Sequence, residues 1–292
     1  MSFNQMQRTI AQPVSVSGYG YWSGQQVQVE FRPASAGTGI RFYREDLPGQ
    51  PEVPAQWAYR LATPRRSSLR AEQAEVQMVE HILAALYGLE IDNCQVWVSG
   101  AEMPGLDGSA LPFVEALEQA GIVLQPVYRC VKVITQRLRL TDADSWIEVR
   151  PSPLGQTVLE YHLDYGPTSP IGRQTFRTVL TPENFRREIA PARTFLLRQE
   201  AEALLAQGLG LRTRPEDLLV FDRHGLINNH LRFADECARH KLLDLIGDLA
   251  LAGCRFIGEF VAFRSGHRLN GELVQILENL ANSESQCMKQ CA

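Results

Sequence analysis

The segment RHKLLDLIGDLAL, Arg239 to Leu251, constrains the fold of this chain more than any other. Its leucines and isoleucine are spread around nearly the whole helical circumference, a pattern typical of a buried helix. The same segment carries ionisable side chains at His240, Lys241, Asp244 and Asp248. Because an unpaired buried charge is very costly, these groups must be paired, bind a metal ion or face a wet cleft.

His240 and Asp244 lie one helical turn apart and therefore share a face of the helix. An imidazole and a carboxylate in this arrangement can bind one metal ion, and they can equally form an ion pair within the helix. The motif alone does not decide between these readings. A second ionisable pair, Glu80 and His81, lies in another apolar helical segment, VEHILAALYGL.

These two helical segments share an internal spacing. His81 precedes Gly88 by the same interval at which His240 precedes Gly247, and each helix leads into a strand that carries a cysteine, NCQVWV or GCRFIGEF. The spacing indicates two copies of one α+β unit, although two unrelated amphipathic helices could match by chance. If the copies pack helix face to helix face, His81 and His240 converge between them.

The rest of the chain fits an α+β protein of two similar domains. Alternation in VSVSGYGYWSGQQVQVEF predicts an antiparallel hairpin, PRRSSLRAEQAE predicts a polar loop over 64–75, and GELVQILENLA predicts a closing helix. Asp107 reads as a turn residue before a helix, with a catalytic role as the weaker alternative. We expect a first domain over 1–125, a second over 126–285, and a disordered tail over 286–292 that contains Cys287 and Cys291.

Composition excludes some classes of function. The net charge of −4 gives no general attraction to nucleic acid, and no dense Lys/Arg cluster offsets it. No apolar run approaches the ~20 residues of a membrane-spanning helix, and the N-terminal segment does not resemble a secretory signal. The six cysteines of a chain this long do not suggest a disulfide framework. We therefore expect a cytoplasmic protein.

If His81, His240 and Asp244 meet, they form a three-ligand zinc site with an open position, the pattern of hydrolytic zinc. Iron(II) suits the same ligands. Glu80, next to His81, could take a proton from the attacking water. His267 in RSGH follows an apolar strand, where a loop could aim it at the site as a general acid; the alternative is a surface histidine.

Separate motifs, in order, carry a family resemblance: VEHILAAL, LDGSALPFVEAL, ARTF, RHKLLDLIGDL and FRSGH. Over roughly residues 8 to 280 the chain closely resembles the UDP-3-O-acyl-N-acetylglucosamine deacetylases of lipid A biosynthesis. The resemblance implies two α+β domains packed helix face to helix face with the active site between them. It also implies zinc-dependent removal of acetyl from a UDP-linked acylated amino sugar, which yields a free amine and acetate.

The resemblance assigns roles to individual residues. Zinc would be held by His81, His240 and Asp244, with Glu80 as the base and a cationic His267 as the acid that protonates the amine. The other implied site residues are Asp248 beside His267, Thr194 at the oxyanion, Phe195 at the sugar, Lys241 and Arg264 at the diphosphate, Tyr165 at the uracil, and Leu196, Leu197, Leu204 and Leu205 along the acyl chain.

The chain departs from the family pattern where substrate is handled. Trp22 replaces a histidine in the early glycine motif, Ser145 stands where a basic residue is expected, and segments 64–78 and 210–220 diverge. A deacetylase of another nucleotide sugar is therefore an alternative, as is a non-catalytic protein whose metal only joins two units. A structural zinc normally has four protein ligands, which disfavours the latter. We expect a monomer.

Overall fold

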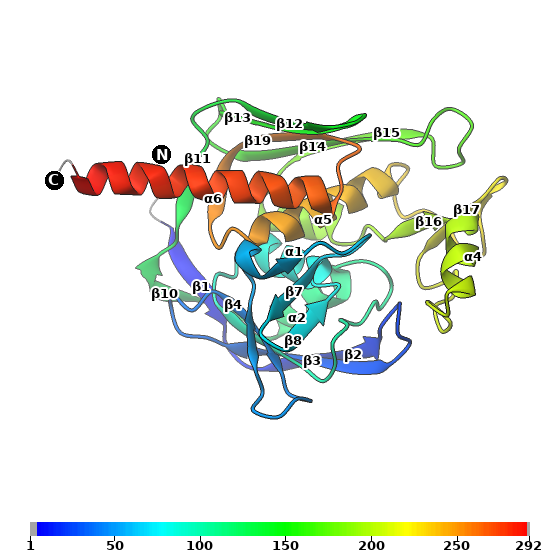
Figure 1. Cartoon of the computed structure of the whole chain (residues 1–292), viewed down its shortest axis with the longest axis horizontal. Helices are drawn as coiled ribbons and strands as arrows, with labels where there is room; N and C mark the ends of the chain where they lie inside the picture. The colour runs from blue at the N-terminus through cyan, green and yellow to red at the C-terminus, as the bar shows by residue number, and fades with distance from the viewer. Residues whose placement is uncertain (1–4, 291–292) are drawn as a thin grey trace.

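The chain folds into two α+β units of the same topology (Figure 1). The computed structural model describes residues 5–290, and the side chains through residue 279. The first five-stranded sheet has the order β2-β3-β9-β4-β5, and the second sheet follows the order β12-β13-β19-β14-β15. In the first sheet, β9 lies between the hairpins β2–β3 and β4–β5 and runs parallel to β4. In the second, β19 lies between the hairpins β12–β13 and β14–β15 and runs parallel to β14. The predicted fold class and the internal repeat are confirmed.

The strands of the two main sheets have the following bounds. The first contains β2 (Val14–Tyr19), β3 (Gln26–Pro33), β4 (Ile40–Arg44), β5 (Glu52–Pro54) and β9 (Cys94–Val98). The second contains β12 (Leu138–Asp142), β13 (Ser145–Arg150), β14 (Thr157–Asp164), β15 (Arg173–Val179) and β19 (Arg255–Phe263), and β11 (Val131–Val133) pairs with β19.

Smaller sheets and short helices complete the architecture. They are β1 (Met6–Ile10) with β10 (Ile122–Tyr128); β6 (Arg60–Leu61), β7 (Ser68–Ala71) and β8 (Ala74–Gln77); β16 (Phe195–Leu197), β17 (Leu219–Asp222) and β18 (Gly225–Leu226); and the helices η1 (Trp57–Tyr59), α3 (Pro182–Asn184), η2 (Phe185–Ile189) and α4 (Arg198–Ala206).

The helices α1, α2 and α5 lie between the two main sheets, as Figure 1 shows. α1 (Glu80–Gly88) packs against α5 (Glu236–Ala250), so the two units meet helix face to helix face. α2 (Leu111–Gln119) contacts the first sheet, while α5 covers β14 and β15 of the second. Every residue of α1 is buried, as is most of α5, which explains why apolar side chains surround the whole circumference of both helices.

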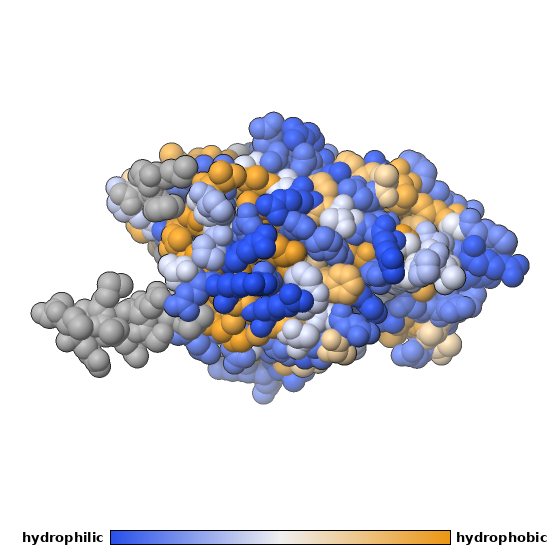
Figure 2. Space-filling view, turned by 90° about the horizontal axis from the view of Figure 1, so that it is seen from above, coloured by the Kyte–Doolittle hydropathy of each residue, from blue (hydrophilic) through white to orange (hydrophobic). Residues whose placement is uncertain are grey.

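Alternation along the strands explains the two faces of the second sheet. In β14, Leu159, Tyr161 and Leu163 are buried toward the helices. The opposite face carries an ion-pair network in which Glu160 binds both His162 and Arg177. Figure 2 looks onto this side of the molecule and shows hydrophilic side chains across its middle. Such exposed pairs add little stability and mark this face as a solvated surface.

Gly247 lets α1 and α5 approach closely. A Cβ at this position would lie 2.2 Å from the carbonyl oxygen of Glu80, and real Cβ atoms do not approach an oxygen so closely. Because the obstacle is backbone, a larger residue would force the two helices apart. The glycine therefore sets the separation across which residues of the two units face each other.

We expect Gly247→Ala to lower the free energy of unfolding by about 1–3 kcal/mol, the usual range for overpacking a core. Thermal unfolding measures the change. Gly100→Ala is the matched control, because its Cβ would make an ordinary 3.6 Å contact with Val27. Equal melting temperatures for the two variants would mean that α1 and α5 can separate without strain.

The polar loop predicted over 64–75 is confirmed for residues 64–67 and wrong from residue 68 onward. Residues 68–77 form the hairpin β7–β8, with Leu69, Ala74 and Val76 fully buried. Its tight turn uses Glu72 at φ +50°, a conformation that glycine or asparagine normally supplies, so the usual turn signal is absent. The closing helix α6 (His267–Gln290) also begins earlier than Gly271, where its pattern was predicted to start.

The proposed domain boundary at residue 125 lies within β10, whose partner β1 is the first strand of the described chain. The proposed tail over 286–292 overlaps the end of α6 and extends beyond the described residues. Within residues 5–290, no helix combines the length and the apolar character needed to cross a membrane.

Candidate active site

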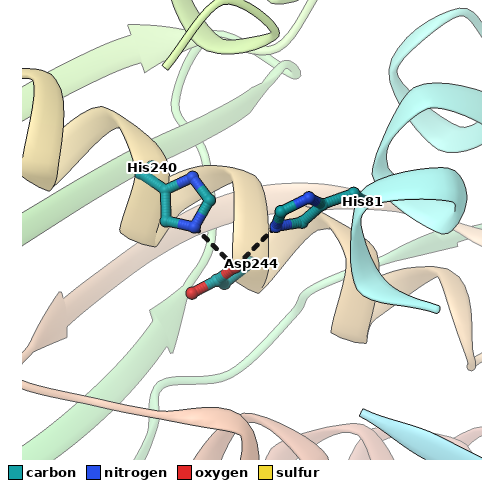
Figure 3. A group of neighbouring side chains, drawn as sticks. All are labelled: His81, His240 and Asp244. Atoms are coloured by element: carbon teal, nitrogen blue, oxygen red, sulfur yellow. Dashed lines mark ion pairs between the residues drawn. The ribbon is translucent and has the colours of Figure 1, made fainter. Parts of the chain in front are cut away.

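The contact between α1 and α5 brings the predicted metal ligands together. His81, His240 and Asp244 present ligand atoms within 4.8 Å of one another, and all three residues are buried (Figure 3). Asp244 Oδ1 lies 3.4 Å from His240 Nε2 and 4.0 Å from His81 Nε2. Figure 3 shows His81 approaching from α1 while the other two side chains project from α5.

The donor set fits a divalent metal ion. Zinc with ligands at about 2.0–2.1 Å in a tetrahedron separates two ligand atoms by roughly 3.3 Å, close to the shorter distance above. His240 Nδ1 lies 3.0 Å from the carbonyl oxygen of Ala192 and donates its proton there, which leaves Nε2 free as a ligand. These two imidazoles and one carboxylate would hold the ion.

Burial and neighbouring charges favour the protonation states that metal ligands need. Burial, with the nearby His240, lowers the pKa of His81 to about 3, and burial also lowers the pKa of His240, so both imidazoles are neutral. Burial alone would raise the pKa of Asp244. The Lys241 ammonium, whose Nζ donates to Asp244 Oδ2 at 2.6 Å, and the imidazoles outweigh it and hold that pKa well below its usual range.

A second pair of residues, the predicted acid–base pair Glu80 and His267, faces these ligands. Glu80 is the first residue of α1, and its Oε1 lies 3.9 Å from His267 Nε2. His267 is the first residue of α6, and the same Nε2 lies 4.0 Å from Asp244 Oδ2. His267 is 8% exposed, so the structure places it in the site rather than on the surface.

The environment separates the pKa values of this pair. Burial, reinforced by the Asp244 carboxylate, raises the pKa of Glu80 to about 7 despite the nearby His267. Burial alone would lower the pKa of His267, but Asp248, whose Oδ2 accepts a hydrogen bond from His267 Nδ1 at 2.9 Å, raises it to about 9. Near neutral pH, Glu80 can therefore accept a proton while His267 carries one, as a general base and a general acid require.

Thr194 lies in a loop that a buried ion pair supports. The preceding residue, Arg193, donates from Nε to Glu236 Oε1 at 2.8 Å, and both side chains are at most 5% exposed. The Thr194 amide donates to the carbonyl oxygen of Gly108 at 2.8 Å. Gly108 has φ +81°, and a Cβ there would approach Thr194 at 3.3 Å, which explains the Asp-Gly-Ser turn beside this loop.

Asp107 belongs to that turn rather than to the acid–base pair. Its Oδ1 accepts hydrogen bonds from the amide and the hydroxyl of Ser109, and its Oδ2 accepts one from Arg232. These contacts lower the pKa of Asp107, although burial opposes them. The turn role predicted from the sequence is confirmed.

The ligands and the acid–base pair open into one cavity of about 1440 Å³ between the two units. Its chemistry divides into apolar, cationic and aromatic groups. The apolar lining includes Leu196, Leu204, Leu205, Leu209, Leu218 and Val220; the cationic lining includes Arg60, Arg65, Lys241, Arg264 and Arg268; and the aromatic lining includes Tyr21, Trp22, Tyr165 and Phe195.

The structure brings most of the predicted substrate residues to this cavity. Phe195 packs edge-on against both His240 and Tyr165, with ring centroids 6.3 and 5.9 Å apart. Arg264 is exposed at the rim. Leu197 differs from the prediction, because it packs against the hydrophobic core and does not line the cavity, whereas its neighbour Leu196 does.

Two polar residues behind the pair were not predicted from the sequence. Ser67 and Asn270 are buried, and both donate hydrogen bonds to Asp248. Ser67 lies in the loop just before β7, and Asn270 lies one turn after His267 on α6. An i, i+3 spacing from His267 is the one pattern that could have identified Asn270.

Two α+β units that enclose a buried His-His-Asp set beside a glutamate and a cationic histidine define a metallohydrolase-like class of protein. The family model for UDP-3-O-acyl N-acetylglycosamine deacetylase matches residues 7–279. The UDP-3-O-acyl-N-acetylglucosamine deacetylases of Brucella ovis and Brucella canis are each 41% identical to this chain over 276 residues, which covers 94% of this chain and 96% of theirs. The chain belongs to this deacetylase family.

Proposed function

We propose that this protein is a metal-dependent amidohydrolase that removes the N-acetyl group from a UDP-3-O-acyl-N-acetylglucosamine, an early step of lipid A biosynthesis. Its products are the free amine and acetate. The observation that carries the proposal is the juxtaposition of the ligand set His81, His240 and Asp244 with Glu80 and His267 in one cavity. Family membership identifies the substrate class.

The residues divide the reaction between them. Zinc is the proposed ion, with iron(II) as the alternative, and when bound it polarises the amide carbonyl and lowers the pKa of water. Glu80 accepts a proton from the attacking water. His267 then donates its Nε2 proton to the leaving nitrogen while Asp248 holds Nδ1. Thr194 donates a hydrogen bond to the developing oxyanion.

The cavity lining matches the parts of the proposed substrate. Lys241 and Arg264 supply positive charge for the diphosphate, Tyr165 offers a face for the uracil, and Phe195 packs on the sugar. The apolar side chains from α4 and β17 accept the acyl chain, with Leu196 rather than Leu197 at their start. One chain supplies every proposed ligand and acid–base group, which supports a monomer. The UDP-linked substrate supports a cytoplasmic location, because UDP-linked sugars are made there.

The direct test is acetate release from UDP-3-O-(3-hydroxyacyl)-N-acetylglucosamine, with metal content measured on the same sample. We expect about one metal per chain, loss of turnover on chelation, and recovery with substoichiometric zinc. Bound metal without turnover would mean that Trp22 and the divergent segments select another acylated sugar. The absence of both bound metal and turnover would refute the hydrolase proposal.

We expect a bell-shaped dependence of kcat/KM on pH. Activity rises as Glu80 loses its proton and falls as His267 loses its own, since their pKa values are about 7 and about 9. A bound dication would lower the pKa values of both Glu80 and His267. The midpoint of the rising limb should therefore not exceed about pH 7, and that of the falling limb should not exceed about pH 9. His267→Gln should remove the falling limb and lower kcat/KM by roughly 10²-fold or more.

His162→Gln is the matched control, because His162 lies on the solvated face of the second sheet. This variant should keep the parental profile. An unchanged profile in His267→Gln would rule out its role as the acid.

A further inference from the structure

Ser67 contacts both halves of the acid–base pair. It precedes β7, is 1% exposed, and donates its hydroxyl proton to Asp248 Oδ1 at 2.6 Å. The same Oγ lies 3.3 Å from His267 Nδ1, and the Ser67 amide donates to Glu80 Oε2 at 3.0 Å. No other residue among those described donates hydrogen bonds to both Asp248 and Glu80.

The contacts to Asp248 fix the direction of the imidazole. Asp248 Oδ2 accepts hydrogen bonds from His267 Nδ1 and from Asn270, both at 2.9 Å. The Ser67 hydroxyl occupies Oδ1, so the carboxylate cannot rotate away from His267. Nε2, the nitrogen that must give up its proton, is thereby held toward the cavity.

The amide of Ser67 acts in the same way on Glu80. By donating to Oε2 it leaves Oε1 free, and Oε1 is the oxygen that lies 3.9 Å from His267 Nε2. The Ser67 carbonyl also accepts a hydrogen bond from the amide of Val79 at 3.2 Å, which fastens this segment to the start of α1. One residue thus aligns the free oxygen of the base and the free nitrogen of the acid.

We propose that Ser67 is a positioning residue for the deacetylation, whose side-chain hydroxyl holds Asp248 and, through it, the proton-donating imidazole of His267. This inference rests on the proposed function. Ser67 lines no part of the cavity and does not contact the proposed metal ligands in the described contacts. Its loss should therefore affect the chemical step and leave substrate and metal binding intact.

The test is Ser67→Ala, with Ser68→Ala as the matched control. Ser68 is the next residue and is also fully buried, but its hydroxyl pairs with Thr63 instead of the acid–base pair. We expect Ser67→Ala to lower kcat by roughly 10-fold to 100-fold, the usual effect of removing such an outer partner, with KM and metal content within about twofold of parental. Ser68→Ala should keep the parental kcat.

Rescue separates positioning from packing. Ser67→Thr keeps the hydroxyl and should recover most of the lost kcat; if its methyl group unfolds the protein, Ser67→Cys, a weaker donor of similar size, should recover part of it. In the background of Asp248→Asn, Ser67→Ala should cost little more, because residues that act through one another are not additive. Equal losses in both backgrounds, or equal losses for Ser67→Ala and Ser68→Ala, would overturn the proposal.

A measurement without substrate distinguishes this proposal from the proposed function. The imidazole nitrogen resonances of His267 should move in Ser67→Ala and stay at their parental positions in Ser68→Ala. If the parental protein releases no acetate but these resonances behave as expected, the substrate assignment fails and the positioning contact stands. If the resonances are identical in all three proteins, the positioning contact fails even where acetate is released.

Discussion

Asp244→Asn should abolish metal binding and activity together. The substitution keeps the size of the side chain and an oxygen that can accept from Lys241, but an amide is a poor ligand for a zinc-type ion. Loss of the ion removes several kcal/mol of transition-state stabilisation, and each 1.4 kcal/mol corresponds to about a factor of ten. We therefore expect kcat/KM to fall by roughly 10³-fold or more, with metal content near zero.

The control for this result is Asp248→Asn on the same helix. Asp248 binds His267, Ser67 and Asn270 and lies outside the ligand set, so this variant should retain metal while its turnover falls. Metal analysis of the two purified variants makes the distinction. A full complement of metal in Asp244→Asn would exclude Asp244 as a ligand.

Glu80→Gln should leave the metal in place and remove the base. Glutamine can still accept the hydrogen bond from the Ser67 amide, so the local packing is preserved. It cannot take a proton from water, and loss of a general base typically costs about 10²–10⁴-fold in rate. Because Glu80 is a buried carboxylate with a raised pKa, its replacement should not destabilise the fold.

Single-turnover acetate release and metal content, measured on one preparation, test this expectation. Normal metal with a slow chemical step supports the assignment of Glu80 as base. Parental turnover would place the base elsewhere, whereas loss of metal would mean that Glu80 supports the neighbouring ligand His81.

The sequence alone identified the central pair of helices because a buried helix that carries charges is unusual. The shared spacing of His81 to Gly88 and His240 to Gly247 predicted the repeat, and the two sheets indeed have one topology. The glycines nevertheless serve different purposes: a Cβ at Gly247 would strike the backbone of Glu80, while one at Gly88 would strike the ring of Phe185. Spacing reveals the repeat but not the contacts it makes.

What the sequence missed depends on tertiary contacts. The hairpin β7–β8 has no turn signal and is rich in polar residues, so its burial follows from neighbours that the local pattern does not reveal. Ser67 is an ordinary serine until the fold places Asp248 and Glu80 beside it. Leu196 and Leu197 are equally apolar, and only the folded structure shows which one lines the cavity.

The acid–base pair also depends on contacts between segments that lie far apart in the sequence. Ser67 meets Asp248 and His267 across 181 and 200 positions of sequence. The entropy of closing such long loops must be overcome before these contacts form, whereas the hairpins and helices of each unit are local. Assembly of the site should therefore trail the formation of either unit during folding. Recovered activity would then report that the two halves have met, which secondary structure alone cannot reveal.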